Sequence, residues 1–162
     1  PDHPYSTILS GTLAAIYAAK KRIYITTPYF IPSDALLIAI KQAALSGVEV
    51  KLILPDKSDS VFVNAASYSY YLEIMKAGVE VYLYEKGFVH AKTIVIDDIL
   101  SIIGTANIDV RSQELNFEVN AMVYEQKLNH DLTTAFYNDL KDCRKIGIEE
   151  WEKRNKLKIF FD

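Results

Sequence analysis

Segments with a helical period alternate with segments of a strand period along the first half of the chain. Ser6 precedes a helical pattern in which apolar residues recur three or four positions apart, and the stretch that follows it alternates as a strand does. The same order then recurs twice. The expected helices are the one capped by Ser6 and those at 33–45 and 60–76, and the expected strands are 22–27, 48–54 and 79–84. Strands joined by helices pair in parallel and are covered by those helices, so the fold class is α/β.

The second half of the chain has shorter connections. Strand-like runs separated by short loops predict antiparallel neighbours that complete a mixed sheet. These runs are 92–96, 99–103 and 117–124; a helix is expected at 128–146 and an amphipathic tail at 148–160. With 162 residues, half of them hydrophobic, the chain buries about two-thirds of its unfolded surface as one domain, 1–162. The prediction is a mixed, largely parallel sheet with helices on both faces.

Composition excludes several classes of function. The net charge of −3 argues against a dedicated nucleic-acid binder, and the single Cys143 offers no disulfide. No metal-ligand spacing is visible and no cofactor is expected. The apolar runs are shorter than the roughly 20 residues that a membrane span requires. The chain opens at Pro1 without an initiator methionine, so we expect it to be a piece of a longer protein.

The stretch HAKTIVIDDILSIIGTANID places polar residues inside an apolar strand pattern. If 90–96 is extended, His90 and Lys92 share one face, and Asn107 follows in the turn after the next strand. A neutral imidazole transfers protons, while an ammonium and an amide hold anionic oxygens, so the set suits a phosphoryl group. Glu118 could fix the imidazole tautomer. The alternatives are a surface histidine and a paired buried carboxylate.

The spacing resembles the signature of the phospholipase D superfamily, H-x-K-x4-D-x6-G-[ST]-x-N (the HKD motif). The matching residues are His90, Lys92, Asp97, Gly104, Thr105 and Asn107. The resemblance implies a phosphohistidine mechanism without metal, in which one histidine attacks phosphorus and a second protonates the leaving alcohol. It implies that Lys92 and Asn107 hold phosphate oxygens with support from Thr105, that Asp97 is structural, and that Glu118 contacts the histidine. Threonine at 105, where serine is frequent, is a conservative departure.

A narrower likeness covers nearly the whole chain. The stretches TPYFIP, SGVEVKLILPDKSDS and GTANIDVRSQELNFEVN resemble the second half of bacterial cardiolipin synthases, which carry two HKD motifs after N-terminal membrane spans. Here there is one motif and no span. One histidine cannot act on both sides of an in-line displacement, so a second must come from a missing N-terminal half or from a second copy of the chain.

The resemblance implies phosphatidyl transfer between two phosphatidylglycerol molecules, with this chain as the C-terminal catalytic half. His90 is then the general acid and base rather than the nucleophile. The parent protein is expected at the bacterial cytoplasmic membrane and this fragment in solution, inactive unless paired. The alternatives are a homodimeric single-motif nuclease or phosphodiesterase, and a binding module that is catalytically incomplete.

Other side chains keep two interpretations. Arg111 and Ser112 either reach phosphate or order the turn after Asn107, and Tyr29 and Phe30 either line a crevice or pack in the core. The tail anchors either dock on the domain or on missing sequence, which is favoured, or touch a membrane. These anchors are Trp151, Leu157 and Phe160. The remaining histidines, His3 and His130, are expected to be solvated.

Overall fold

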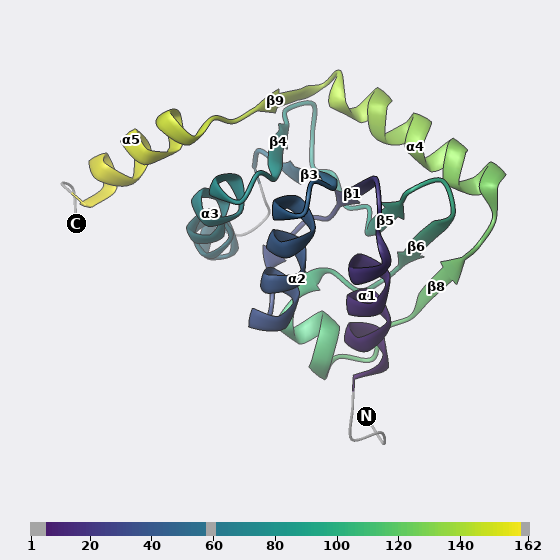
Figure 1. Cartoon of the computed structure of the whole chain (residues 1–162). Coiled ribbons are helices and arrows are strands. Elements are labelled where there is room, and N and C mark those ends of the chain that lie inside the picture. The colour runs from purple at the N-terminus through teal and green to yellow at the C-terminus, as the bar shows by residue number, and fades with distance from the viewer. Residues whose placement is uncertain (1–5, 58–60, 160–162) are drawn as a thin grey trace.

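The fold is a mixed sheet of seven strands in the order β8-β6-β5-β1-β3-β4-β9, with a separate pair of short strands, β2 and β7, in the part of the chain that the structure describes (Figure 1). The structure is a computed structural model that describes residues 6–57 and 61–159. The helices are α1 (Thr7–Ala18), α2 (Asp34–Leu45), α3 (Val61–Lys76), α4 (Gln126–Leu140) and α5 (Ile148–Ile159), with a π-helical turn, η1 (Arg111–Leu115). The strands are β1 (Arg22–Thr26), β2 (Phe30–Ile31), β3 (Glu49–Pro55), β4 (Glu80–Tyr84), β5 (Thr93–Ile96), β6 (Leu100–Gly104), β7 (Ile108–Asp109), β8 (Asn120–Val123) and β9 (Cys143–Lys145).

The helix and strand units of the first half lie where the sequence predicts them. Ser6 caps α1, because its side-chain oxygen accepts a hydrogen bond from the Leu9 amide at 3.2 Å. Gly47 and Gly78 follow α2 and α3 with φ of 90° and 102°, a conformation that glycine adopts without strain. The strands β1, β3 and β4 pair in parallel, as expected for strands joined by helices. The predicted start of α3 at Ser60 lies outside the described residues.

The second half corrects three predictions. Of the six neighbouring strand pairs that the structure describes in the main sheet, two are parallel and four antiparallel, so the sheet is mixed as predicted but is not largely parallel. The helix predicted at 128–146 ends at Leu140, and 143–145 forms β9, because that segment pairs with β4. The strand predicted at 117–124 is shorter and begins at Asn120.

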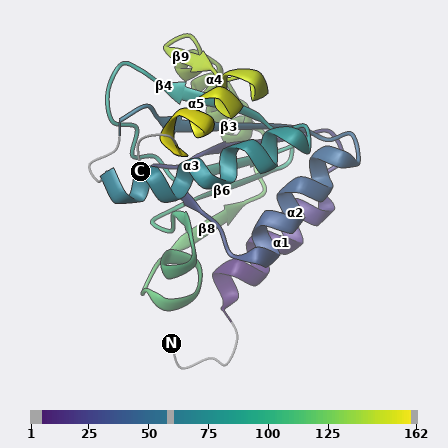
Figure 2. The same cartoon turned by 90° about the vertical axis from the view of Figure 1, so that its left-hand side faces the viewer.

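Helices cover both faces of the sheet, as predicted. Side chains of β1 alternate between two cores: Ile23 and Ile25 point to the larger one, and Tyr24 points to the smaller one, where its ring stacks on Phe136 of α4 at 4.7 Å. Figure 2 shows α4 on one side of the sheet and α1, α2 and α3 on the other. The fold class is therefore an α/β sandwich with an α-β-α order of layers.

The helix α5 docks on the domain through Trp151, which confirms the docking interpretation for this anchor. The indole is 1% exposed, lies 5.2 Å from the Tyr68 ring and 5.3 Å from the Tyr71 ring, and donates to the Tyr68 carbonyl at 3.2 Å. Leu157 and Phe160 lie outside the described side chains. Within the described ranges, none of the helices is long and apolar enough to cross a membrane.

Candidate functional site

Asp97 anchors the motif to the sheet from the side of α1. Its carboxylate accepts hydrogen bonds from three consecutive amides, those of Lys20 at 3.0 Å, Lys21 at 2.8 Å and Arg22 at 2.9 Å. Burial raises the pKa of Asp97, but the three donors outweigh burial and hold its pKa below the usual value. With a φ of 51°, Asp97 also makes the turn between β5 and β6. These contacts favour the structural role that the resemblance implies.

His90 and Lys92 lie in the loop before β5 rather than on a strand, so the prediction of alternating strand side chains is wrong for this pair. Pairing with β1 begins at Thr93, and the Lys92 carbonyl accepts a hydrogen bond from the Gly104 amide at 3.2 Å. Lys92 Nζ turns back and donates to the His90 carbonyl at 2.8 Å. The His90 imidazole is exposed and lies 5.5 Å from the Phe88 ring. The Lys92 side chain thus bonds to the main chain of His90, and the His90 imidazole itself is accessible to a reactant.

The environment of Lys92 is partly buried and acidic. Burial lowers the pKa of Lys92 below its ordinary value, while the carboxylates of Glu118 and Asp109 oppose that shift. Glu118 therefore lies close enough to act on the lysine electrostatically. Its carboxylate also accepts from Asn116 Nδ2 at 3.3 Å. The contact of Glu118 with the His90 imidazole remains a prediction.

Gly104 and Thr105 bring the segment of Glu118 alongside the end of β6. The Thr105 amide donates to the Val119 carbonyl and the Val119 amide donates to Thr105 Oγ1, both at 2.9 Å. A Cβ at position 104 would overlap the Val119 carbonyl and the Asn120 side chain, so only glycine permits this approach. The Thr105 hydroxyl thus supports the backbone, and its contact with substrate remains a prediction.

Asn107 is held by the turn that follows it. Its Nδ2 donates to Ser112 Oγ at 3.2 Å, and its carbonyl accepts from Gln113 Nε2 at 2.8 Å. Ser112 is 2% exposed and bonded to Asp109, which favours the interpretation that it orders the turn. The turn is the π-helical η1, which the sequence analysis missed; such turns occur often at functional sites.

A cavity of about 460 Å³ opens beside Asn107. Tyr29 and the exposed Arg111 line it, so Arg111 is placed where it could meet an anion, although that role stays a prediction. The other lining residues are Ile31, Val63, Asp109, Val110, Ser112 and Asn116. Phe30, in contrast, is fully buried in the core, so the crevice interpretation is wrong for it.

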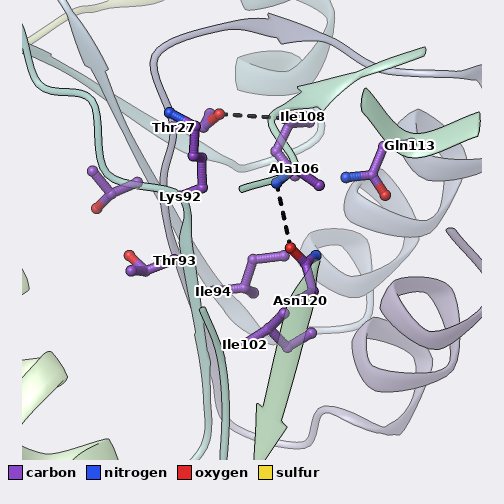
Figure 3. Close-up of a pocket in the computed structure, with 10 residues that line it drawn as sticks. Thr27, Lys92, Thr93, Ile94, Ile102, Ala106, Ile108, Gln113 and Asn120 are labelled. Carbon is purple, nitrogen blue, oxygen red and sulfur yellow. Dashed lines mark hydrogen bonds between the residues drawn. The ribbon is translucent and has the colours of Figure 1, made fainter. Parts of the chain in front are cut away.

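A second, water-sized cavity of about 10 Å³ lies under Lys92 (Figure 3). Gln113 and Asn120 line it, and the sequence analysis singled out neither residue. The Asn120 side chain accepts from the Ala106 amide at 3.3 Å, and Thr27 Oγ1 accepts from the Ile108 amide at 3.3 Å. Both bonds pin the loop that carries Asn107. Gln113 stands six residues after Asn107, and Asn120 stands two residues after Glu118, and neither position belongs to the HKD signature, so the sequence contains no direct signal for them.

The structure therefore joins part of the predicted set. Glu118 lies close enough to Lys92 for its charge to act on the lysine, and the Asn107 side chain donates a hydrogen bond to Ser112. His130 is exposed on α4, as expected, and His3 lies outside the described residues. Within residues 6–57 and 61–159, no group of three or more His, Cys, Asp or Glu side chains is arranged to hold a metal ion.

Comparison with known proteins gives matches along nearly the whole chain. Residues 12–140 match the family model described as cardiolipin synthase, PLD-like domain. A cardiolipin synthase of Clostridium perfringens is 46% identical over 155 residues, which cover 96% of this chain and 33% of that protein. The major cardiolipin synthase ClsA of Bacillus subtilis is 47% identical over 154 residues, 95% of this chain and 32% of that protein. The chain thus spans about a third of the length of these relatives, and the matched segment is their C-terminal part.

Solved structures share the fold at lower identity. Nuc from Salmonella typhimurium, a phospholipase D family member, superposes with a TM-score of 0.76 at 20% identity, covering 88% of this chain and 93% of that one. The phosphatidylserine synthase of Haemophilus influenzae superposes with a TM-score of 0.74 at 17% identity, covering 90% of this chain and 38% of that one.

Proposed function

Because the chain belongs to the family of cardiolipin synthase, PLD-like domains, we propose that it is the C-terminal catalytic half of an enzyme that makes cardiolipin from two phosphatidylglycerol molecules. The observation that carries the proposal is the complete HKD motif, which lies along and around β5 and β6 in a chain that is 45–48% identical to several cardiolipin synthases. The enzyme is a transferase of the phospholipase D type and needs no cofactor for the steps below.

The reaction has two displacements at one phosphorus atom. A histidine nitrogen attacks the phosphodiester of the first phosphatidylglycerol, the bond to the glycerol headgroup breaks, and a second histidine gives that glycerol oxygen a proton. A hydroxyl of the second phosphatidylglycerol then loses its proton to that second histidine, which now acts as the base, attacks phosphorus and displaces the first histidine. The products are cardiolipin and glycerol. General acid and base catalysis of this kind contributes about 10²- to 10⁴-fold in rate.

Within this scheme His90 is the general acid and base, because it is the histidine of the later, C-terminal half; its imidazole is exposed in the loop before β5. The Lys92 ammonium lowers the repulsion between the phosphodiester and the attacking group. Asn107 donates an amide hydrogen to a phosphoryl oxygen. Glu118 fixes the tautomer of His90, and Arg111 lies in the larger cavity beside Asn107.

The attacking histidine comes from outside these residues. In-line displacement needs the nucleophile and the acid on opposite sides of phosphorus, so His90 requires a partner histidine. This chain covers about a third of the length of its relatives, which is consistent with a partner half within one longer protein. A second copy of the chain, related by a twofold axis, would also supply a second histidine. The parent enzyme works at the bacterial cytoplasmic membrane, where its lipid substrates lie.

A hybrid enzyme tests the proposal. This chain replaces the matched segment of the Bacillus subtilis relative, and the hybrid is expressed in a strain that lacks cardiolipin synthase. Cardiolipin and glycerol are expected from phosphatidylglycerol, and His90→Ala should abolish their formation while the hybrid still accumulates in the membrane fraction. His130→Ala, at an exposed position on α4, is the matched control and should leave the product unchanged. A folded hybrid without product, or a His90→Ala hybrid with full product, would refute the proposal.

A further inference from the structure

Asp109 holds Ser112 at two points. Its Oδ1 accepts from the Ser112 amide at 2.7 Å, and its Oδ2 accepts from the Ser112 hydroxyl at 3.3 Å. Ser112 is 2% exposed, so water does not compete for these bonds. The first bond caps the start of η1, and the second fixes the direction of a hydroxyl group.

That hydroxyl decides which end of the Asn107 amide faces it. A carboxylate only accepts hydrogen bonds, so the single proton of the Ser112 hydroxyl points to Asp109. The Ser112 oxygen must then accept its next bond, and Asn107 Nδ2 provides the donor at 3.2 Å. The Asn107 Oδ1 atom is turned the other way, buried and without a hydrogen-bond partner among the described residues. The second hydrogen on Nδ2 is left for a ligand.

The backbone at Asn107 is fixed independently of its side chain. The Asn107 carbonyl accepts from Gln113 Nε2 at 2.8 Å, and the Gln113 carbonyl accepts from the hydroxyl of Ser6 at the start of α1. A change at Asp109 would therefore alter the direction of the amide more than the position of the main chain. Asp109 is also one of the two carboxylates whose charge acts on Lys92, so it lies close to both phosphate-holding residues.

We propose that Asp109 is a positioning residue that, through Ser112, turns the N–H of the Asn107 amide toward the phosphodiester. The proposal rests on the proposed function for the identity of the ligand but not for the hydrogen-bond chain itself. Asp109 contacts no reacting atom. Its effect passes through the proton of Ser112.

Asp109→Asn separates this role from simple capping. The substituted amide still accepts from the Ser112 N–H, so the cap of η1 is retained. It presents an N–H to the Ser112 hydroxyl in place of an acceptor, so Ser112 gives its proton to Asn107 instead. The Asn107 amide then reverses, and its N–H₂ group moves to the buried place that Oδ1 held. A residue that only capped the turn would show no such reversal.

Nuclear magnetic resonance of the 162-residue chain reads the direction of the amide without any activity. In the unchanged chain, the side-chain amide protons of Asn107 should show nuclear Overhauser contacts to the Ser112 β-protons. Asp109→Asn should abolish them, and Ser112→Ala should remove the preference for one direction. Asp131→Asn, on the exposed face of α4, makes the same change of charge and should leave the contacts intact. Contacts that persist in folded Asp109→Asn overturn the proposal.

Kinetics of the hybrid enzyme provide the second reading. Loss of one aligned donor costs on the order of 10²-fold in kcat, so Asp109→Asn should lower kcat by about that factor with little change in KM. In an Asn107→Ala background, Asp109→Asn should cost nothing further, because both changes remove the same donor. If the kcat losses of the two single variants multiplied in the double variant, the proposal would be overturned. An inactive parent hybrid would instead refute the proposed function, since the magnetic resonance result stands alone.

Discussion

Removal of the Asp97 carboxylate should destabilise the fold far more than removal of its neighbour Asp98. Asp97→Asn keeps one oxygen for the amides of Lys21 and Arg22, but it turns an N–H₂ toward the Lys20 amide, which also donates. One bond is lost, a buried donor is left unpaired, and two bonds lose their charge. With about 1.5–3 kcal/mol for a bond to a charged group, the expected loss is about 2–3 kcal/mol in the free energy of unfolding.

Asp97→Ala should cost more, about 4–5 kcal/mol, because all three amides lose their acceptor. Alanine also tolerates the φ of 51° less well than asparagine does. Asp98→Asn is the matched control. The Asp98 side chain is 58% exposed and pairs with Arg22, and an exposed ion pair contributes about 0–1 kcal/mol.

The dependence on pH follows from the direction of the pKa shift. The folded-state pKa of Asp97 lies below its unfolded value, so the carboxylate stabilises the fold above the unfolded value of about 4. This stabilisation is lost as the pH falls through the lower folded-state value. Urea unfolding of the original chain and of Asp97→Asn should therefore converge in strong acid. Equal stability at pH 7, or a gap that persists in acid, would refute the account.

Three further predictions concern packing, register and charge. Trp151→Ala should lower the free energy of unfolding by about 3–5 kcal/mol, because the indole is buried against two tyrosine rings; thermal melting measures this, and an unchanged melting temperature would contradict docking of α5. Gly104→Ala should cost more than about 2 kcal/mol, because the added Cβ overlaps the Val119 carbonyl; Gly87→Ala, which meets no neighbour, should have little effect in the same urea titration. Affinity for inorganic phosphate should fall as the pH rises through the pKa of Lys92, which lies below the ordinary lysine value near 10.4. Lys92→Gln should remove this dependence on pH. A transition at or above the ordinary lysine value would contradict the burial of the ammonium.

The first half of the fold could be predicted because its signals are local. Caps, terminal glycines and apolar strands specify each unit within about 25 residues, and β1, β3 and β4 then pair in parallel. The strand β9 could not be predicted, since 143–145 is extended only through its hydrogen bonds to β4. The helix pattern that precedes it runs on in the sequence past the point where that pairing takes over.

The motif names candidate site residues but does not give their geometry. Its spacing selected Asp97 as a structural residue, and the hydrogen bonds from three backbone amides favour that role. It did not show that His90 and Lys92 precede β5, because strand alternation was assumed before Thr93, where pairing with β1 begins. Asp109 was missed although it stands three residues before Ser112, a spacing at which an aspartate caps a turn. The direction of a hydroxyl proton depends on side-chain contacts that a pattern of letters does not contain.

We propose that His90, Lys92 and Asn107 hold one phosphodiester between them. Titration of short-chain phosphatidylglycerol into the isotopically labelled chain, followed by nuclear magnetic resonance, tests it directly. The account predicts that the side-chain signals of all three residues shift together along one binding curve, with a dissociation constant on the order of 1 mM or weaker for a site that lacks its second histidine. Signals that shift along separate curves, or shifts confined to other surfaces of the domain, would contradict it.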